Sequence, residues 1–543
     1  MRSRTAVYML CCVLSLASSV LGQGFGTISG AISDPSGASL AQASVVATEI
    51  ATGLSRSSVA SQEGYYVLNS LRPAPSQVWH DAFHQNEVFQ AKLFAQGVRS
   101  TMFPNAPPGL LFSGDKGVPE YGTTGDYMNF APRLGFAYDV FGNGRTSVRG
   151  GGGIFYDSRV PAFSNNRELG AAPYASSVSL TTPKGTFSNP YLGITNPFPA
   201  QFPPLANAIF SSPVQVYSWD PYSKFTTPVN YSWNVAVEQE LKHDWLARIA
   251  YVGSRANHLT VTLEENPAIY TPGSALSINQ RRLYSGFSNI YQASQAGNSW
   301  YQSAQFTLQK RLSRGFTISA NYTFSKSLDN LPQGTDAATF GTAGFYTLPI
   351  YLPNFQQYDR GPSDFDHRHV FVSSYVWQAP SLSGLNRLLR AVAGGWEVSG
   401  VISSQSGGPL TLYVGKDQSL TGIGKDRAQF TGGEVYKTGP CANTAPCTSF
   451  LNAASFALPA PGAFGNVGKG AFAGPGFFNW DTGIFKNFPL NERFKIQFRG
   501  EFFNVLNHTR FLNPVTTVTG AGFGNILSAS DPRIVQLALK VFF

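Results

Sequence analysis

The segment from Phe316 to Phe324 alternates apolar and polar residues without a break, and this alternation constrains the fold more than any other feature of the chain. Phe316, Ile318, Ala320, Tyr322 and Phe324 fall on one face of an extended strand, while the residues between them are all Thr, Ser or Asn. A period of two residues indicates a β-strand whose two faces meet different surroundings.

Ten further segments show the same alternation or an aromatic-rich form of it, and turn residues separate them. The pattern predicts these strands at residues 134–140, 148–156, 233–241, 246–252, 304–309, 369–377, 396–402, 477–485, 494–502 and 534–543. Asn143-Gly144 lies between the first two, which is a strong hairpin signal. The eleven segments together predict an all-β chain with antiparallel strands.

The composition agrees with a β fold and excludes several other classes. Charged residues make up 13% of the 543 residues and hydrophobic residues 43%, which does not fit a disordered chain. Four cysteines are too few for a disulfide scaffold. Beyond the N-terminus no apolar run reaches the ~18 residues of a membrane helix, so a helical membrane protein is also excluded.

The aromatic residues, 14% of the chain, bear on which face of the strands meets water. In a soluble sandwich the apolar face packs inward, whereas in a membrane barrel it meets lipid and the polar face lines the lumen. Strands of about nine to eleven residues with aromatic ends suit a membrane crossing. We expect the interfacial aromatic belts to include Trp233, Tyr301, Tyr322, Trp377, Trp396 and Trp480.

The lengths of the connections favour the same fold. Those near residues 141–144, 242–244 and 313–315 are short, whereas residues 157–229, 254–299, 326–367 and 403–474 form long ones. Short turns at one end and long loops at the other are typical of outer-membrane barrels. The last strand ends at Phe543, a terminal aromatic residue of the kind expected to be read by the barrel-assembly machinery. A soluble β architecture remains the alternative.

The N-terminus predicts export. Met1 to Gly22 combine Arg2 and Arg4 with an apolar run, and cleavage is expected between Gly22 and Gln23. A single membrane anchor is the alternative. Removal of this segment takes away two arginines and lowers the formal net charge from +9 to +7. Without a block of basic residues, that charge does not indicate a nucleic-acid partner.

Two cysteines remain after removal of the signal segment. Cys441 and Cys447 lie in a loop-like stretch rich in Pro and Ala, with no His or further Cys nearby to complete a metal site. Since exported chains meet oxidising conditions, we predict a local disulfide between them.

Residues 23–74 carry strand and turn signals of their own. The motifs are Gly26-Thr-Ile-Ser-Gly30, Asp34-Pro-Ser-Gly-Ala38, Ala43-Ser-Val-Val46, Thr52-Gly53 and Gly64-Tyr65-Tyr66. They resemble a carboxypeptidase regulatory-like domain, which implies a transthyretin-like β-sandwich of about seven strands. This copy is truncated, because it departs from the family pattern at Pro73-Ala74.

The remaining chain resembles a second family. The carrying motifs are Asn129-Phe-Ala-Pro-Arg-Leu-Gly-Phe-Ala-Tyr138, Arg149-Gly-Gly-Gly-Gly-Ile-Phe-Tyr156, Gly361-Pro-Ser-Asp-Phe-Asp-His-Arg-His369, Gly394-Gly-Trp396, Phe478-Asn-Trp-Asp481, Phe498-Arg-Gly-Glu-Phe-Phe-Asn504 with Asn507-His508, and the last strand. They are similar to the barrel of Oar-like TonB-dependent outer-membrane transporters. The resemblance assigns residues 131–543 to the barrel and implies a 22-stranded family barrel, a plug and a TonB partner.

The chain departs from that family in its middle. Between Leu71 and Trp79 no plug-like sequence appears, roughly ten early strands are missing, and no TonB box is evident. Residues 75–130, rich in Pro and Gly, are predicted to be an irregular connection. The barrel is therefore expected to be partial relative to the family.

A search for catalytic and metal motifs gives no assignment. Asp364, Asp366, His367 and His369 cluster, but alternate residues of a strand point to opposite faces, so we expect no metal site there. Gly465 to Gly470 lacks the Ser or Thr of a phosphate loop. We expect neither a cofactor nor enzyme activity. Arg499 and Glu501 share the polar face of their strand, and we expect them to line the lumen and pair across it.

These observations lead to one leading functional hypothesis and two alternatives. The leading one is a barrel in the outer membrane of a Gram-negative bacterium that moves or binds a bulky extracellular ligand. Its partners would be outer-membrane lipid, the assembly machinery and, if a plug were present, the TonB complex. The alternatives are a non-transporting surface or adhesion barrel, and a plug-less fragment without transport activity of its own.

Overall fold

The fold divides into two compact units, residues 1–78 with 125–133 and residues 79–124 with 134–543, and each is described by itself. The computed structural model describes residues 26–31, 44–48, 55–59, 61, 65–71, 86–118, 129–157, 172–174, 185–186, 188–189, 191–193, 204, 206–210, 212–219, 226–242, 244–332, 346–380, 386, 392–439, 447–489, 491 and 494–543. The signal segment, with Gly22 and Gln23, lies outside the described residues, as does Cys441.

The first unit contains four short strands. They are β1 (Gly26–Ala31), β2 (Ser44–Thr48), β3 (Ser55–Val59) and β4 (Tyr65–Leu71). β1 pairs antiparallel with β4, and β2 pairs antiparallel with β3. The alternating segments predict β1, β2 and β4, whereas β3 was not predicted, because its sequence Ser-Arg-Ser-Ser-Val carries little hydrophobic pattern. The assignment of this unit to a regulatory-like domain stays a prediction.

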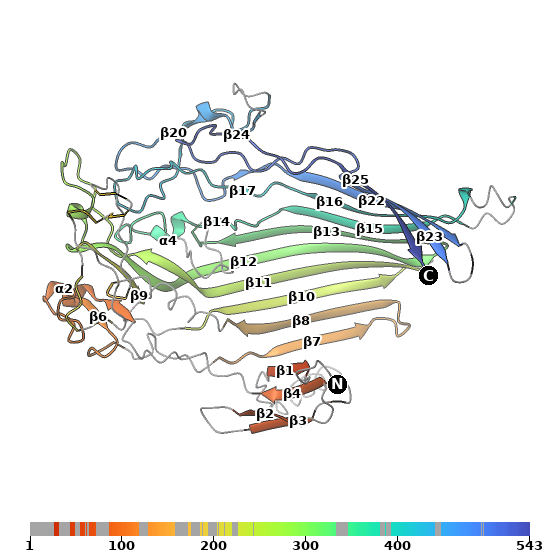
Figure 1. Cartoon of the computed structure of the whole chain (residues 1–543), viewed down its shortest axis with the longest axis horizontal. Coiled ribbons are helices and arrows are strands. Elements are labelled where there is room, and N and C mark those ends of the chain that lie inside the picture. The colour runs from red at the N-terminus through yellow and green to blue at the C-terminus, as the bar shows by residue number, and fades with distance from the viewer. Residues whose placement is uncertain are drawn as a thin grey trace, which may run out of the picture. The chain divides into compact units, whose positions relative to one another are not determined.

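The second unit is built on eleven long strands, which lie side by side in Figure 1. They are β7 (Arg133–Asp139), β8 (Thr146–Tyr156), β10 (Val229–Glu240), β11 (Trp245–Glu264), β12 (Phe287–Ser313), β13 (Phe316–Asp329), β15 (His369–Gln378), β16 (Trp396–Gln405), β22 (Phe477–Pro489), β23 (Lys495–Phe503) and β25 (Ile534–Phe542). Each coincides with one of the eleven predicted strands, so the all-β prediction is confirmed.

These strands form one path in chain order, from β7 at one edge to β25 at the other. The neighbours from β8 onward pair antiparallel. Among the described residues, β7 and β25 do not pair with each other. Because eleven is odd, both edge strands run toward the same end, as their arrows show in Figure 1. A direct bond between them would therefore be a parallel pair.

The register produces a sheet with one apolar and one polar face. Val237, Ile249, Phe306, Tyr322 and Phe371 are successive partners across five strands. The neighbouring residue on each strand belongs to the adjacent row on the opposite face, and four of the five residues in that row are polar: Glu238, Arg248, Thr307, Asn321 and Val372.

The apolar face is open to the surroundings. Leu537 and Leu539 on β25 are 66% and 71% exposed, and Phe306 and Leu308 on β12 are also exposed. Soluble monomers rarely expose a contiguous apolar patch of more than a few hundred Å². From Phe316 to Phe324 this face extends roughly 20 Å along the normal of a tilted sheet, near the ~25 Å band of outer-membrane barrels. The face thus suits contact with lipid.

Short connections and the C-terminus lie at one end of the strands and the long connections at the other (Figure 1). Between β12 and β13 the turn is Arg314-Gly315, with φ values of 50° and 75°. Two positive φ values in a two-residue hairpin loop define a type I′ turn, whose twist matches that of the strands. We call the two ends the turn end and the loop end.

Two strands extend further toward the loop end than predicted. β11 continues to Glu264 and β12 begins at Phe287, so much of the predicted loop 254–299 is strand. The Ala, Gly and Ser residues there hide the alternation, but the β11–β12 ladder continues after a shift in register. Tyr301 lies inside β12 on the polar face, one residue from Trp300 on the apolar face, so its placement in an aromatic belt was wrong.

Part of the segment predicted to be irregular, 75–130, has regular structure within the described residues 86–118. It contains β5 (Glu87–Phe89), α2 (Ala91–Ala95) and β6 (Leu110–Phe112), and β5 pairs with both β6 and β9 (Val214–Trp219). A buried cluster that includes Phe89, Phe112 and Phe287 joins this segment to the loop end of β12. These aromatic residues bury enough surface to order a segment that is rich in turn residues.

Small elements order the other long connections. They are η1 (Asn279–Arg281), α4 (Phe355–Tyr358), β14 (Gly361–Pro362), β17 (Pro409–Leu410), β18 (Gln429–Phe430), β19 (Thr448–Ser449), η2 (Ala453–Ser455), β20 (Phe456–Ala457), β21 (Phe472–Ala473) and β24 (Asn525–Ile526). In the described part of the chain, no helix has the length and apolar character needed to cross a membrane.

Candidate functional site

The long connections at the loop end are tied to one another by backbone and side-chain hydrogen bonds. The amide of Ala268 donates to Thr421 O at 2.8 Å, and the hydroxyl of Tyr351 donates to Ala268 O at 3.1 Å. The amide of Phe450 donates to Gly524 O at 3.0 Å. We call the described residues of 265–286, 346–368, 406–476 and 504–533 the loop cap. Its segments come from four separate connections and are hydrogen-bonded to one another.

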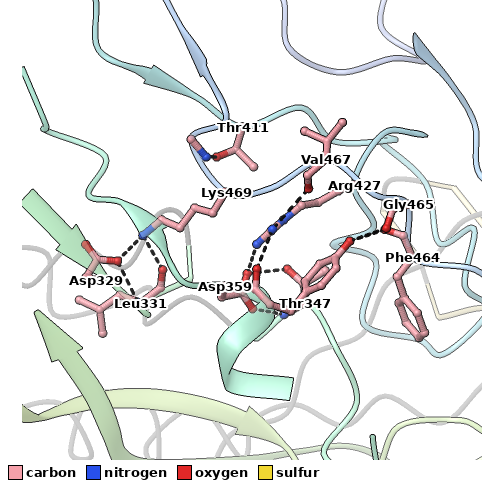
Figure 2. A network of polar contacts seen from close by, with 12 residues as sticks. Asp329, Leu331, Thr347, Asp359, Thr411, Arg427, Phe464, Gly465, Val467 and Lys469 are labelled. Atoms are coloured by element: carbon pink, nitrogen blue, oxygen red, sulfur yellow. Dashed lines mark hydrogen bonds and ion pairs between the residues drawn. The ribbon is translucent and has the colours of Figure 1, made fainter. Parts of the chain in front are cut away.

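A buried arginine holds the centre of the loop cap (Figure 2). Arg427 is 1% exposed, forms an ion pair with Asp359 and donates to Tyr358 O at 2.8 Å. Asp359 also accepts from the amide and the hydroxyl of Thr347, at 2.7 and 2.9 Å. The guanidinium lies 4.4 Å from the centre of the Tyr358 ring, a cation–π distance. The ion pair therefore connects residues 346–360 to residues 409–473.

Tyr358 extends the same network. Its hydroxyl donates to Phe464 O at 2.8 Å and to Gly465 O at 3.0 Å. Burial raises the pKa of the Tyr358 hydroxyl to about 12, so it remains a donor at neutral pH. Gly465 has φ of 77°, and a Cβ there would lie 2.1 Å from Arg427 O. Only glycine fits at that position, because the two backbones approach too closely for a side chain.

Two lysines attach the loop cap to the end of β13. Lys469, 3% exposed, pairs with Asp329 and donates to Leu331 O at 2.7 Å, as drawn in Figure 2. Lys326 pairs with Asp366 at 3.3 Å, and Asp366 also accepts from the Ser327 amide at 2.6 Å. The cap is thus fixed to the strands by charged side chains that are buried or partly buried.

Two buried acidic residues of segment 86–118 have pKa values shifted in opposite directions. Burial alone would raise the pKa of Asp115, but hydrogen bonds from Ser100, Thr101 and Phe112 outweigh burial and lower it. Glu87 is 1% exposed, and burial raises its pKa well above the usual value, against one hydrogen bond from the Tyr217 amide. Its second oxygen, Oε2, is buried without a hydrogen-bond partner.

We expect Glu87→Gln to stabilise segment 86–118 at pH 7.5. A raised folded pKa favours folding below about pH 4.5, and this contribution is lost as the pH rises through the folded pKa. The variant removes the ionisation and should gain about 1–3 kcal/mol at pH 7.5 and nothing at pH 4. Hydrogen exchange of residues 86–118, corrected for intrinsic rates, measures this. Exposed Glu434→Gln is the control, and an equal gain at both pH values would contradict the expectation.

The polar face carries its own ion pairs. Glu238 on β10 lies 3.5 Å from Arg149 on β8 and 3.3 Å from Arg248 on β11, so one carboxylate joins three strands. Arg499 and Glu501 do share this face, but they pair with each other along β23 at 2.8 Å. The predicted pairing across a lumen was therefore wrong in its partner, because residues i and i+2 of a strand point the same way.

The remaining residues singled out in the sequence are Cys441, Cys447, Phe543 and the cluster around His367 and His369. Cys447 is disulfide-bonded, and its pairing with Cys441 stays a prediction. Phe543 is 95% exposed after the end of β25, and its role as an assembly signal stays a prediction. The described residues contain no group of three or more His, Cys, Asp or Glu side chains placed to hold a metal ion. His367 and His369 instead contact Ser406 O and the Tyr322 hydroxyl, at 2.8 and 2.7 Å.

The central ion pairs of the loop cap were not predicted from the sequence. Lys469 belongs to the segment from Gly465 to Gly470, which lacks the full pattern of a phosphate loop, and no sequence pattern marks Arg427 or Asp359. Arg427 and Asp359 are separated by 68 residues, and neither lies in an alternating segment. A buried pair between two long loops leaves no local pattern in the sequence.

Comparisons with known proteins give one family match. The sequence model of a family described as an outer membrane beta barrel domain matches residues 71–536. A search of curated protein sequences found no match.

Solved structures similar to the chain are outer-membrane transporters and receptors. The transporter YddB from Escherichia coli has 13% identity and a TM-score of 0.42 over 76% of this chain and 40% of that one. The ferric-catecholate import receptor Fiu from E. coli has 9% identity and a TM-score of 0.31, over 76% of this chain and 34% of that one. A variant of the ferric enterobactin receptor PfeA from Pseudomonas aeruginosa has 10% identity and a TM-score of 0.36, over 76% of this chain and 40% of that one. The chain spans less than half the length of each.

Proposed function

Because the chain belongs to the outer membrane beta barrel domain family and is placed in a Gram-negative outer membrane, we propose that its loop cap binds a bulky ligand at the cell surface. The observation that carries this proposal is the interlocked cap at one end of a two-faced sheet. Long barrel loops face the outside of the cell. Buried ion pairs hold the cap in one arrangement before any ligand arrives, which lowers the entropy cost of binding.

The polar face supports a lumen beneath the cap. Arg149, Glu238 and Arg248 form a charged group there, and Arg499 and Glu501 form another. Charged side chains are costly against lipid and are tolerated on a water-filled side. We therefore infer that the polar face, with Arg499 and Glu501, lines the path of a transported ligand.

We further propose that the barrel transports its ligand with energy supplied through TonB. This part of the proposal rests on the resemblance of residues 131–543 to Oar-like transporters. The stretch between Leu71 and Trp79 lacks a plug-like sequence, which favours the second candidate, a surface barrel that binds without transporting.

Two measurements separate these candidates. Recovery in outer-membrane fractions, with heat-modifiable migration on gels, should be found in either case. Mass spectrometry of the growth medium should then show solutes that are depleted only when both the chain and TonB are present. Depletion independent of TonB, or none at all, would support the surface barrel. A soluble periplasmic product would contradict both.

A further inference from the structure

A basic cavity lies at the loop end of β11, β12 and β13. Its volume is about 320 Å³, and its lining includes Arg255, Asn298, Trp300, Leu328, Gln357 and Arg360. The first four belong to the strands, whereas Gln357 and Arg360 come from α4 and the residues after it. The loop cap therefore forms one wall of the cavity and the sheet forms the other.

The register places the strand side of this cavity on the lipid-facing side of the sheet. Tyr231, Arg255, Trp300 and Leu328 are successive partners across four strands. They stand six residues from Val237, Ile249, Phe306 and Tyr322 on the same strands, with no bulge between the two rows. Six is an even number, so both rows point to the same face. Most of the strand side chains that line the cavity therefore point outward, and Ser299 and Asp329 belong to the adjacent row on the polar face.

The cavity stands just beyond an aromatic group that marks the edge of the apolar band. The rings of Phe306, Tyr322, Phe324 and His369 contact one another at this height. Leu328 is four residues beyond Phe324, which is roughly 10 Å further along the membrane normal for a strand tilted by ~40°. Lipid headgroups lie at that height, directly outside the hydrocarbon.

The charge of the cavity favours an anion. Neither Arg255 nor Arg360 forms an ion pair with an acidic side chain among the described residues. The one acidic residue that lines the cavity, Asp329, is already paired with Lys469. Trp300 is 45% exposed, and the Arg255 guanidinium lies 5.7 Å from its ring centre. Two guanidinium groups therefore share the cavity with an apolar wall.

We propose that this cavity binds the phosphate group of an anionic glycolipid headgroup in the outer leaflet. The planar donors of Arg255 and Arg360 match a phosphate, and Asn298 and Gln357 can contact the attached sugar. Trp300 and Leu328 cover the apolar side of that sugar. The proposal needs the chain to lie in the outer membrane with its loops outside, but it does not need transport.

The test uses the full chain folded in detergent micelles and native mass spectrometry with diphosphorylated lipid A as the probe. Each arginine near a charged lipid surface contributes about a factor of five in binding, so Arg255→Gln with Arg360→Gln should weaken lipid A retention about 25-fold. Arg255→Lys with Arg360→Lys keeps both charges but loses the planar donors, so it should retain lipid A better than the double glutamine variant and less well than the parent chain. Arg145→Gln, an exposed arginine at the turn end, is the matched control and should behave as the parent chain.

The parent chain alone also tests the proposal, so misfolding of a variant cannot hide the answer. It should retain lipid A in preference to dephosphorylated lipid A, and inorganic phosphate should compete only weakly. Equal retention of the two lipids would overturn the proposal. Inorganic phosphate that displaces lipid A completely would assign the cavity to a free anion instead. Equal losses in the double glutamine variant and in Arg145→Gln would also overturn it.

Discussion

Leu308→Arg should destabilise the folded chain in a lipid bilayer by about 2–4 kcal/mol. Leu308 is exposed on the apolar face of β12, between Lys310 on the side of the turn end and Phe306 in the aromatic group. At that height an arginine would meet the middle of the hydrocarbon. Unfolding by urea in phosphatidylcholine vesicles, followed by tryptophan fluorescence and heat-modifiable migration, measures the loss.

The neighbouring residue supplies the control. Gln309 points to the polar face, and its cross-strand partners Leu246 and Ser319 carry no charge. Gln309→Arg should therefore change stability by less than about 1 kcal/mol. If the chain were soluble, Leu308→Arg would replace an exposed apolar residue by a polar one at little cost. A loss of the same size in both variants would contradict the two-faced sheet.

The strands could be predicted because the two faces of each strand meet different environments, so apolar and polar residues alternate along its sequence. Phe316 to Phe324 alternates at every position, and the register shows these five apolar residues on one face. The loop-end half of β12 could not be predicted in this way. Beyond the hydrocarbon both faces of the sheet meet water or the loop cap, so selection for alternation is lost and small polar residues suffice.

The candidate site was predictable only where strand periodicity reached it. The shared face of Arg499 and Glu501 follows from their spacing of two, and the structure agrees. Their ion partners do not follow from spacing, because neighbours on the same strand compete with residues on other strands. The core of the loop cap joins Arg427 to Asp359 through loops whose paths depend on packing, which local sequence does not specify.

Arg427→Met should open the loop cap while leaving the strands intact. The substitution keeps much of the side-chain volume but leaves Asp359, which is 1% exposed, buried without its cation. Removing one partner of a buried ion pair costs about 3–5 kcal/mol. Hydrogen exchange of residues 346–360 and 409–439 should accelerate on the order of a hundredfold or more. Exchange in β12 and β13 and heat-modifiable migration should stay as in the parent chain.

The double variant Arg427→Met with Asp359→Asn distinguishes a lost attraction from an unpaired buried charge. Asparagine can still accept from Thr347, and it removes the charge that methionine cannot neutralise. We therefore expect the double variant to recover most of the protection that Arg427→Met loses. Lys437→Met, at an exposed lysine of the same connection, should have no effect. If the double variant exchanged as fast as Arg427→Met, the geometry of the guanidinium and its contact with Tyr358 would hold the cap, and the buried charge would not be the cause.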